Sequence, residues 1–358
     1  MTTRVVTVTA ERPDRDKIRE AADVLRAGGL VAFPTETVYG LGAHALDARA
    51  VARIFAAKGR PSTDPVIVHL ARAEDLARVA DDVPPIAYRL AERFWPGALT
   101  LILRKNAAVP DIVTAGLATV GVRVPAHPVA RLLIEEAGVP VAAPSANRFS
   151  RPSPTTAAHV LADLDGVIDL VVDAGPTPIG VESTILDLTE QPPVVRRPGG
   201  VGIEALRRVV PDATALTEVL SAERAQRSPG QLTRHYAPSA PLTLYVGSSD
   251  AVAERLARDI RMAVASGMRV GVLAPSEDLL ALAPRLAAIG ATGRVVTMRC
   301  GSRADRAAAA RELFSALRAL DTEGLDVIYS AAPAGDDLDA AIVDRLTRAA
   351  EGRVIRLD

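Results

Sequence analysis

Apolar residues recur every three or four positions in several stretches of the first 210 residues, and short runs rich in Val, Ile and Thr lie between them. The first pattern predicts amphipathic helices near 15–27, 48–58, 84–94, 128–137 and 156–163. Asp47 as an N-cap and Pro128 in a first helical turn support two of these helices. The second pattern predicts strands at Leu30–Phe33, Val66–Leu70, Leu99–Leu103, Thr119–Val124, Val139–Ala143, Val167–Val172, Thr184–Leu188 and Val194–Arg197. We therefore expect an open, twisted, mixed α/β sheet in a domain over residues 1–213.

Residues 214–241 are polar, contain three prolines and lack a sustained strand pattern, so they are expected to link two domains. Residues 242–358 then alternate strand and helix patterns regularly. The alternation favours a smaller Rossmann-like α/β domain with a parallel sheet. It lacks a GxGxxG fingerprint, so no dinucleotide site is expected there. The expected strands are Leu242–Val246, Arg269–Leu273, Arg294–Met298, Val327–Ser330 and Val354–Leu357, and the expected helices lie near 250–266, 277–288, 303–320 and 336–351.

Composition and charge narrow the functional classes. The 358 residues include one cysteine, Cys300, and neither a signal-peptide core nor an apolar run of membrane-spanning length, so a cytoplasmic protein without membrane attachment is expected. The formal net charge is −1, and residues 1–200 carry 22 basic and 23 acidic side chains. Tight binding of a nucleic-acid backbone by bulk charge is therefore not expected.

Two polar segments could bind an anionic ligand. An apolar strand runs into PTETVYGLGA, where Thr35, Thr37 and Tyr39 bring hydroxyls together. Composition alone favours ordinary turn chemistry at a strand end, and a binding role requires partners elsewhere in the chain. Lys58 and Arg60 end a predicted helix and precede Ser62 in a loop. They suit polyphosphate oxygens, but a helix dipole also favours basic residues at this end. A Walker-A loop is absent from the sequence, which excludes an ordinary P-loop NTPase.

Strand alternation and strand ends place further candidates. His69 shares a strand face with Ile67, and Arg123 shares one with Thr119 and Gly121, opposite a row of valines. A guanidinium on a central strand requires an anionic partner, from the protein or a ligand. Side chains at the ends of other strands or in the following loops could join it: Ser145, Asn147, Arg151, Ser183 and Arg197.

Taken together, these segments resemble the YrdC-like threonylcarbamoyl-AMP synthase family, in its larger two-domain form. Lys58-x-Arg60 combined with Ser145-x-Asn147 is the family's signature, and HYAP at 235–238 resembles its linker motif. The resemblance extends over nearly all of residues 30–200. It is carried by PTETVYGLGA (34–43), KGRP (58–61), PVIVH (65–69), WPGALTLIL (95–103), TAGLATVGVRVPAHP (114–128), PVAAPSAN (140–147), RPSPT (151–155), GVESTILDL (180–188) and RRPGG (196–200).

The resemblance implies a nucleotidyltransferase. L-Threonine, bicarbonate or CO2 and ATP would give threonylcarbamoyl-AMP, pyrophosphate and water, with Mg²⁺ on the nucleotide and no metal site of the protein's own. The product would pass to the tRNA threonylcarbamoyl transferase machinery. Lys58 and Arg60 are the implied catalytic residues. Threonine would be held by Thr35, His69, Arg123 and Ser183, and the nucleotide by Lys58, Arg60, Ser62, Thr114, Ser145, Asn147, Arg151, Arg197 and Tyr236.

Tyr236, in the linker over 214–241, would close as a lid that excludes water from labile intermediates. The general base stays open, because His69, His127 and His235 all lie in the matched segments and a substrate phosphate or solvent could serve instead. The pocket residues do not exclude serine or another small amine as acceptor. A rival interpretation is an RNA-binding or ribosome-associated module without adenylyl transfer. The balanced charge and the 11 Phe, Trp and Tyr residues of the chain argue against it.

Overall fold

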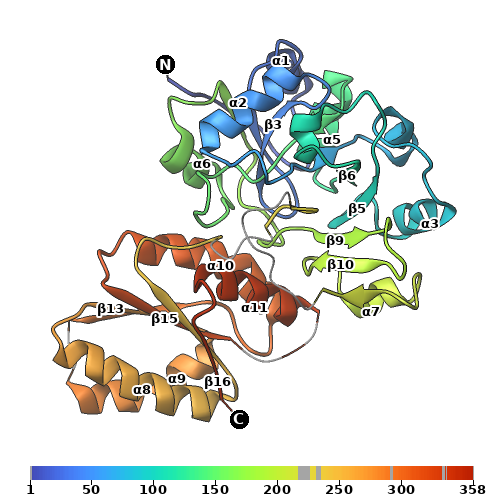
Figure 1. Cartoon of the computed structure of the whole chain (residues 1–358). Coiled ribbons are helices and arrows are strands. Elements are labelled where there is room, and N and C mark those ends of the chain that lie inside the picture. Colours follow the sequence, from blue (N-terminus) through green and yellow to red (C-terminus); the bar gives the residue numbers. More distant parts are fainter. Residues whose placement is uncertain are drawn as a thin grey trace. The chain divides into compact units, whose positions relative to one another are not determined.

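The computed structural model describes residues 2–216, 226–230, 235–290, 293–332, 335 and 337–357. The chain forms two compact units (Figure 1). The N-terminal unit comprises Met1–Phe149 and Ser153–Leu232, and the C-terminal unit comprises Thr233–Asp358 together with the short segment Ser150–Pro152. The division along the chain falls within the predicted linker, of which residues 217–225 and 231–234 lie outside the described residues. The sequence did not predict that Ser150–Pro152 joins the second unit.

The N-terminal unit is built on a mixed sheet. Among the described residues its strands follow the order β1-β8-β2-β3-β7-β4-β6-β5-β9-β10-β11. Parallel and antiparallel neighbours alternate irregularly along this order, as in the pairs β4–β6 and β5–β6. The strands are β1 (Arg4–Thr7), β2 (Val31–Pro34), β3 (Tyr39–His44), β4 (Val68–His69), β5 (Leu99–Arg104), β6 (Thr119–Arg123), β7 (Val141–Ala142), β8 (Leu170–Asp173), β9 (Thr184–Asp187), β10 (Val194–Arg197) and β11 (Thr214–Ala215).

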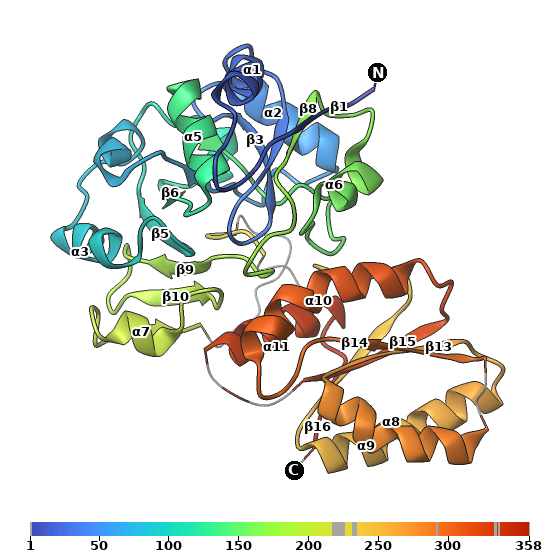
Figure 2. The same cartoon turned by 180° about the vertical axis from the view of Figure 1, so that it is seen from behind.

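Helices cover both faces of the β2 region of this sheet (Figure 2). On β2, Val31 and Phe33 enter the apolar cluster formed with α1 and α5, while Ala32 enters a second, larger cluster. Successive strand residues point to opposite faces, so the sheet is buried on both sides here. The helices are α1 (Arg15–Arg26), α2 (Ala48–Lys58), the 3-10 helix η1 (Ala73–Arg78), α3 (Pro85–Phe94), α4 (Asp111–Thr114), α5 (Pro128–Ala137), α6 (Ala157–Leu164) and α7 (Ile203–Arg207).

The structure confirms the five long helices predicted for the N-terminal unit to within a residue at each end. The predicted caps are also present: the Asp47 side chain accepts a hydrogen bond from the Arg49 N–H, and Pro128 starts α5. The strand prediction was less complete. β3 was interpreted as a polar turn, because its sequence YGLGAH contains two glycines and few β-branched residues. Pairing with β2 as a hairpin makes it a strand, which only the tertiary structure reveals.

The C-terminal unit contains an all-parallel sheet in the order β14-β13-β15-β12-β16, with α8 packed on α9 and α10 on α11. Figure 1 shows the two helix pairs on opposite faces of this sheet. The predicted mixed and parallel α/β fold classes are therefore both confirmed. The elements are β12 (Leu242–Val246), α8 (Ser249–Ala265), β13 (Val270–Ala274), α9 (Ser276–Ile289), β14 (Val295–Arg299), α10 (Arg306–Asp321), β15 (Val327–Ala332), α11 (Leu338–Ala349) and β16 (Val354–Arg356).

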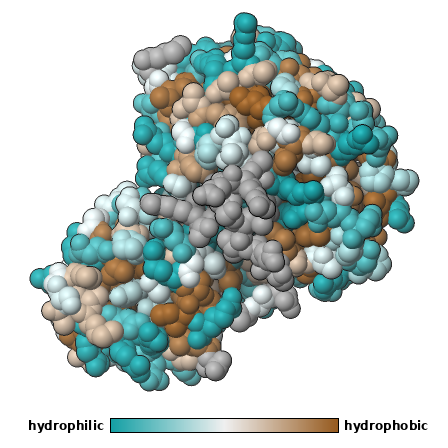
Figure 3. Space-filling view, viewed as in Figure 1, coloured by the Kyte–Doolittle hydropathy of each residue, from teal (hydrophilic) through white to brown (hydrophobic). Residues whose placement is uncertain are grey.

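Exposed apolar side chains are scattered over the surface. On the face drawn in Figure 3, brown hydrophobic residues are interspersed among teal hydrophilic ones. The large apolar residues that are exposed include Val5, Tyr88, Met262 and Leu280, which belong to different elements. Single exposed apolar residues are ordinary in folded proteins. In the described part of the chain, every helix is too short or too polar to cross a membrane.

Candidate active site

The turn between β2 and β3 brings two of the predicted hydroxyls together. Thr35 Oγ1 lies 2.8 Å from Thr37 Oγ1 and accepts from the backbone N–H groups of Thr37 and Val38. In this turn the Thr35 hydroxyl accepts the hydrogen bonds that a backbone carbonyl accepts in an ordinary turn. Both threonines are buried, so their hydroxyls are held in place for neighbouring groups rather than exposed to bulk solvent.

Arg123 reaches this turn from β6. Its Nη1 donates to Thr37 Oγ1 (3.0 Å) and its Nε donates to the Gly97 carbonyl (3.0 Å). Its Nη2 lies 2.6 Å from a carboxylate oxygen of Glu36, and both side chains are less than a tenth exposed. Burial alone would raise the pKa of Glu36, but the guanidinium outweighs burial and holds the pKa below its usual value. The anionic partner that a strand arginine requires is thus supplied by the protein.

His69 lies beside Arg123, because β4 and β6 pair with these two residues in register. Its ring packs edge-on against Phe33 at a centroid distance of 6.4 Å. Nδ1 is buried and has no hydrogen-bond partner among the described residues. Burial, followed by the charge of Arg123, lowers the pKa of His69 to about 3. The imidazole is therefore neutral at physiological pH and presents an unused polar atom.

Lys58 ends α2, and Gly59 follows in the left-handed conformation (φ 63°) that terminates the helix. The buried Lys58 ammonium donates to the Ser145 and Asn147 carbonyls, each at 2.5 Å. These contacts join the two halves of the family signature directly. Ser145 and Asn147 follow β7, as the sequence predicted.

Arg60 turns back onto its own loop. Its guanidinium donates to the Asp64 and Pro65 carbonyls, and Nη2 lies 3.0 Å from Asp64 Oδ1. Asp64 is fully buried. Burial raises the pKa of Asp64, while the charges of Arg60, Lys58 and Arg197 oppose this shift. Of the three cations, Arg60 is the one with a direct contact to this carboxyl group.

Arg197 at the end of β10 is held by the segment before β9. Its Nε and Nη2 donate to the Ser183 carbonyl at 3.1 and 2.9 Å, and Ser183 Oγ lies 2.8 Å from Thr100 Oγ1. Gly199 permits this approach, because a Cβ there would lie 2.4 Å from the Glu182 carbonyl oxygen.

One loop connects the threonine-binding and nucleotide-binding residues proposed within the N-terminal unit. The Ile179 and Gly180 N–H groups donate to the carbonyls of Glu36 and Thr37, and the same loop continues to Ser183 beside Arg197. On the other side, β3 forms a bridge to Ser145, next to Lys58. The predicted residues of the N-terminal unit other than Ser62 and Thr114 therefore lie in one connected polar region. Thr114 is buried with its hydroxyl donated to the Leu117 carbonyl, while Ser62 is exposed.

The described piece of the linker, residues 226–230, packs on the N-terminal unit. The Gln226 N–H donates to the Thr63 carbonyl, and Arg197 Nη1 donates to the Pro229 carbonyl. Arg227 ion-pairs with the buried Asp187. Together with residues 65–67 before β4 and with α4, β5, β6 and β9, this piece lines a hollow of about 10 Å³, which is room for about one water molecule.

Two predicted nucleotide-binding residues belong to the C-terminal unit. Arg151 pairs with Asp321 of α10 at 3.2 Å. Tyr236, 1% exposed, packs against Phe314 of the same helix. The lid function of Tyr236 stays a prediction.

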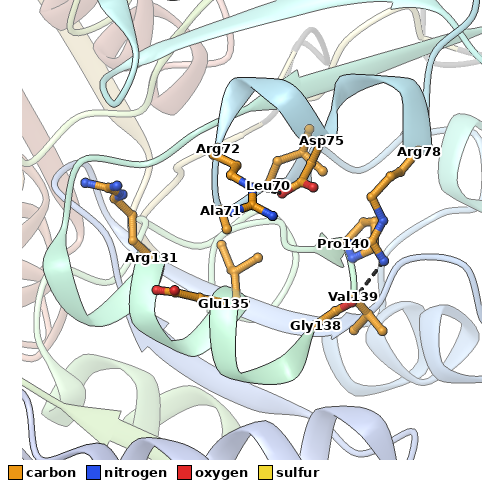
Figure 4. A pocket seen from close by; sticks show the side chains of 11 residues that line it. Leu70, Ala71, Arg72, Asp75, Arg78, Arg131, Glu135, Gly138, Val139 and Pro140 are labelled. Atoms are coloured by element: carbon orange, nitrogen blue, oxygen red, sulfur yellow. Dashed lines mark hydrogen bonds and ion pairs between the residues drawn. The ribbon is translucent and has the colours of Figure 1, made fainter.

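A separate surface hollow of about 390 Å³ lies between η1 and α5 (Figure 4). Arg72, Arg78 and Arg131 line it with acidic neighbours. Arg78 donates to the Gly138 carbonyl and Arg72 pairs with Asp75. This hollow contains none of the predicted site residues, and two of its three guanidinium groups already have protein partners.

Sequence reasoning missed two buried carboxylates, Glu36 and Asp64. Both lie within or next to matched motifs, and a signal was available, because each buried arginine or lysine requires a nearby counter-charge. For Arg60 the counter-charge is local, because Asp64 follows it by four positions, whereas the pairing of Arg123 with Glu36 depends on tertiary contacts. Across the described ranges, no three His, Cys, Asp or Glu side chains gather as a possible metal site.

The fold and this site define a two-domain nucleotide-dependent transferase. The chain matches the Sua5/YciO/YrdC family, described as telomere recombination, over residues 23–199, and the threonylcarbamoyl-AMP synthase C-terminal domain over residues 201–351. The chain belongs to the threonylcarbamoyl-AMP synthase family in its two-domain form. The resemblance and the enzyme class predicted from the motifs are thereby confirmed.

Full-length relatives agree with this assignment. The threonylcarbamoyl-AMP synthases of Pyrococcus abyssi and Bacillus subtilis are 45% and 44% identical, covering 97% and 98% of this chain and 98% of each relative. The crystal structure of P. abyssi Sua5 complexed with L-threonine matches with a TM-score of 0.89 at 42% identity, over 99% of this chain and 100% of that one. A second structure of that protein, with alanines replacing an adjacent histidine and tyrosine, matches equally well (42% identity, TM-score 0.89, 99% of this chain and 98% of that one).

Proposed function

We propose that the N-terminal unit converts L-threonine, bicarbonate or CO2 and ATP into threonylcarbamoyl-AMP and pyrophosphate. The observation that carries this proposal is the connected polar region, in which a buried arginine beside two threonine hydroxyls adjoins a group of three cations. ATP, bicarbonate and the carboxylate of threonine carry negative charge near neutral pH, so cationic side chains are required to bring them together. Membership of the family and the threonine complex of its P. abyssi member support the same reaction.

Threonine would bind next to Arg123, which supplies charge for the carboxylate, with Thr35 and Ser183 as polar contacts. The neutral His69 would use its unpartnered Nδ1 as a hydrogen-bonding atom toward the substrate. With its pKa lowered to about 3, His69 is a poor proton acceptor, so the amine proton would pass to bicarbonate or a phosphate oxygen instead.

The reaction would proceed in two steps. The threonine amine attacks the carbon of CO2 or bicarbonate to give a carbamate, with loss of water from bicarbonate. A carbamate oxygen then attacks the α-phosphorus of ATP, and the bond to the β-phosphate oxygen breaks to release pyrophosphate. Lys58, Arg60 and Arg197 would stabilise the charge that develops on the departing group.

Mg²⁺ would enter on the nucleotide, because this ion usually binds substrate phosphates and retains several waters. Asp64, which pairs with Arg60 and feels the charges of Lys58 and Arg197, is the carboxylate that could approach such an ion. The phosphates would then be neutralised jointly by the ion and the three side chains.

The adjacent histidine and tyrosine altered in the P. abyssi variant support a role for His235 and Tyr236, since the sequence contains a single His-Tyr pair. The product would be passed to the tRNA threonylcarbamoyl transferase machinery. The single buried cysteine supports a cytoplasmic setting.

The test is pyrophosphate release by the purified full chain with ATP, bicarbonate, Mg²⁺ and threonine. Omission of threonine should abolish release, and replacing it with serine or glycine measures how strictly the acceptor is selected. Unchanged release without threonine would overturn the acceptor assignment. Tight tRNA binding without pyrophosphate release would favour the rival RNA-binding interpretation.

A further inference from the structure

Glu36 is a buried carboxylate to which the proposed reaction gives no role. It lies in the turn between β2 and β3, is 7% exposed, and its backbone carbonyl accepts from the Ile179 N–H at 2.9 Å. Replacing a buried ion pair by apolar residues is often neutral or stabilising. Stability alone therefore does not account for a charge at this position.

Glu36 and Arg123 keep hydrogen-bonding capacity although they face one another. Glu36 Oε1 lies 2.6 Å from Arg123 Nη2, yet neither atom, nor Glu36 Oε2, forms a hydrogen bond of good geometry within the described part of the chain. Burial raises the pKa of Glu36, but Arg123 and the nearby Ala126 N–H lower it below its usual value, so the carboxylate is charged at neutral pH. The pair thus offers both an acceptor and a donor to a ligand.

His69 adds a third polar atom of this kind. It pairs in register with Arg123 between β4 and β6, and its buried Nδ1 lacks a hydrogen-bond partner among the described residues. Buried polar atoms are almost always hydrogen-bonded in folded proteins. Three neighbouring side chains with unsatisfied atoms therefore indicate that a polar ligand belongs here.

The zwitterion of an α-amino acid matches this set of atoms. Its ammonium and carboxylate groups are attached to the same carbon, and Glu36 and Arg123 present the two complementary charges side by side. The pair is neutral as a whole. It therefore favours a ligand that carries both charges over a ligand that carries only one, since the latter leaves one member of the pair without a partner.

We propose that Glu36 binds the ammonium group of threonine while Arg123 Nη2 binds its carboxylate. This inference rests on the proposed function, in which threonine is the acceptor. An isolated carboxylate would hold the amine in its protonated, unreactive form, and the charge of Arg123 weakens that effect. Glu36 can therefore orient the amine before its proton passes to bicarbonate or a phosphate oxygen.

The test measures binding of L-threonine to the full-length protein by isothermal titration calorimetry, without ATP or bicarbonate so that turnover does not occur. Glu36→Gln should raise the dissociation constant about 10- to 100-fold, the scale of one charge-assisted hydrogen bond. The second ligand is (R)-3-hydroxybutyrate, which is L-threonine without its amino group. For this ligand the same substitution should not raise the dissociation constant by more than about twofold.

Comparison of the two ligands separates direct contact from an effect through Arg123. Both ligands carry the carboxylate, so a variant that only displaced Arg123 would weaken both equally, and that result would overturn the inference. An unchanged threonine affinity in Glu36→Gln would overturn it as well.

Asp187→Asn is the matched control, because it also removes one charge of a buried pair, formed with Arg196 at 3.0 Å on the β9–β10 hairpin. Its threonine dissociation constant should stay within about twofold of wild type. A loss as large as that of Glu36→Gln would indicate a general structural effect and would also overturn the inference.

Glu36→Asp keeps the result decisive if Glu36→Gln does not fold. Aspartate retains the charge beside Arg123 but is one methylene shorter, so it should weaken threonine binding by a smaller factor and leave the analogue unaffected. Unchanged threonine binding by a folded Glu36→Asp would then overturn the inference. Failure of the proposed function is distinguishable, because the wild type would bind threonine without releasing pyrophosphate from ATP.

Discussion

Glu36→Gln should destabilise the N-terminal unit strongly, because it removes one charge of a buried pair. The Glu36 carboxylate lies 2.6 Å from Arg123 Nη2, with both side chains nearly inaccessible. At an effective dielectric constant of about 20, the gross attraction over that distance is about 6 kcal/mol. Breaking such a pair from one side typically costs about 3–5 kcal/mol. Glutamine retains the shape and an acceptor oxygen, so we expect about 3 kcal/mol, the lower end of this range.

Urea unfolding followed by Trp95 fluorescence measures this cost. The chain has one tryptophan, which is buried in the N-terminal unit two residues before Gly97, a partner of Arg123. With an m-value of about 2–3 kcal/mol/M, the midpoint should fall by roughly 1–1.5 M. Because the signal arises from one unit, it is not averaged with unfolding of the other.

Glu20→Gln is the matched control, since Glu20 forms an exposed pair with Arg4. Exposed pairs contribute about 0–1 kcal/mol, so its midpoint should stay close to that of wild type. The lowered folded-state pKa of Glu36 means that its contribution is present above the unfolded value near 4.5 and is lost as the pH falls through the folded value. The Glu36→Gln difference should therefore shrink in acid. Equal midpoints for the two variants at pH 7 would refute the reasoning.

Three further predictions concern the site and its surroundings. Lys58→Met and Arg197→Met should each lower kcat for pyrophosphate release by a factor of about 10² or more, while circular dichroism still shows a folded protein. Retention of full activity by both variants would contradict their assignment to the nucleotide site. His69→Gln should flatten the pH dependence of stability. Between pH 6.5 and 3 the unfolded histidine is protonated and the buried one is not, so the free energy of unfolding of the wild type falls by up to about 1.4 kcal/mol per pH unit. Identical urea midpoints of variant and wild type at every pH from 4 to 7 would disprove this. Arg131→Ala, in the surface hollow between η1 and α5, should leave KM and kcat within twofold of wild type in the same assay, and a large rise in the KM for ATP would instead place a nucleotide contact there.

The alternation of buried apolar side chains along β6 was predicted correctly from the sequence. The valines at 120, 122 and 124 enter the larger apolar cluster, and Gly121 and Arg123 occupy the opposite side, as the sequence indicated. The Rossmann-like second unit was equally accessible, because its helices and strands alternate regularly. Short strands were less predictable, since β4 and β7 each retain only two paired residues. Their pairing depends on neighbours far away in the sequence.

The amino-acid sequence by itself determined the family, the main helices, the faces of the central strands and the set of residues able to bind charged substrates. These properties depend on periodicity and local motifs, which neighbouring residues encode. Only the tertiary structure showed that Glu36 balances Arg123 and that Ser150–Pro152 belongs with α10. Such partnerships join positions from about 85 to 170 residues apart, as for Arg123 with Thr37 and Arg151 with Asp321. Short-range patterns carry no record of them, because long-range packing decides which charges meet.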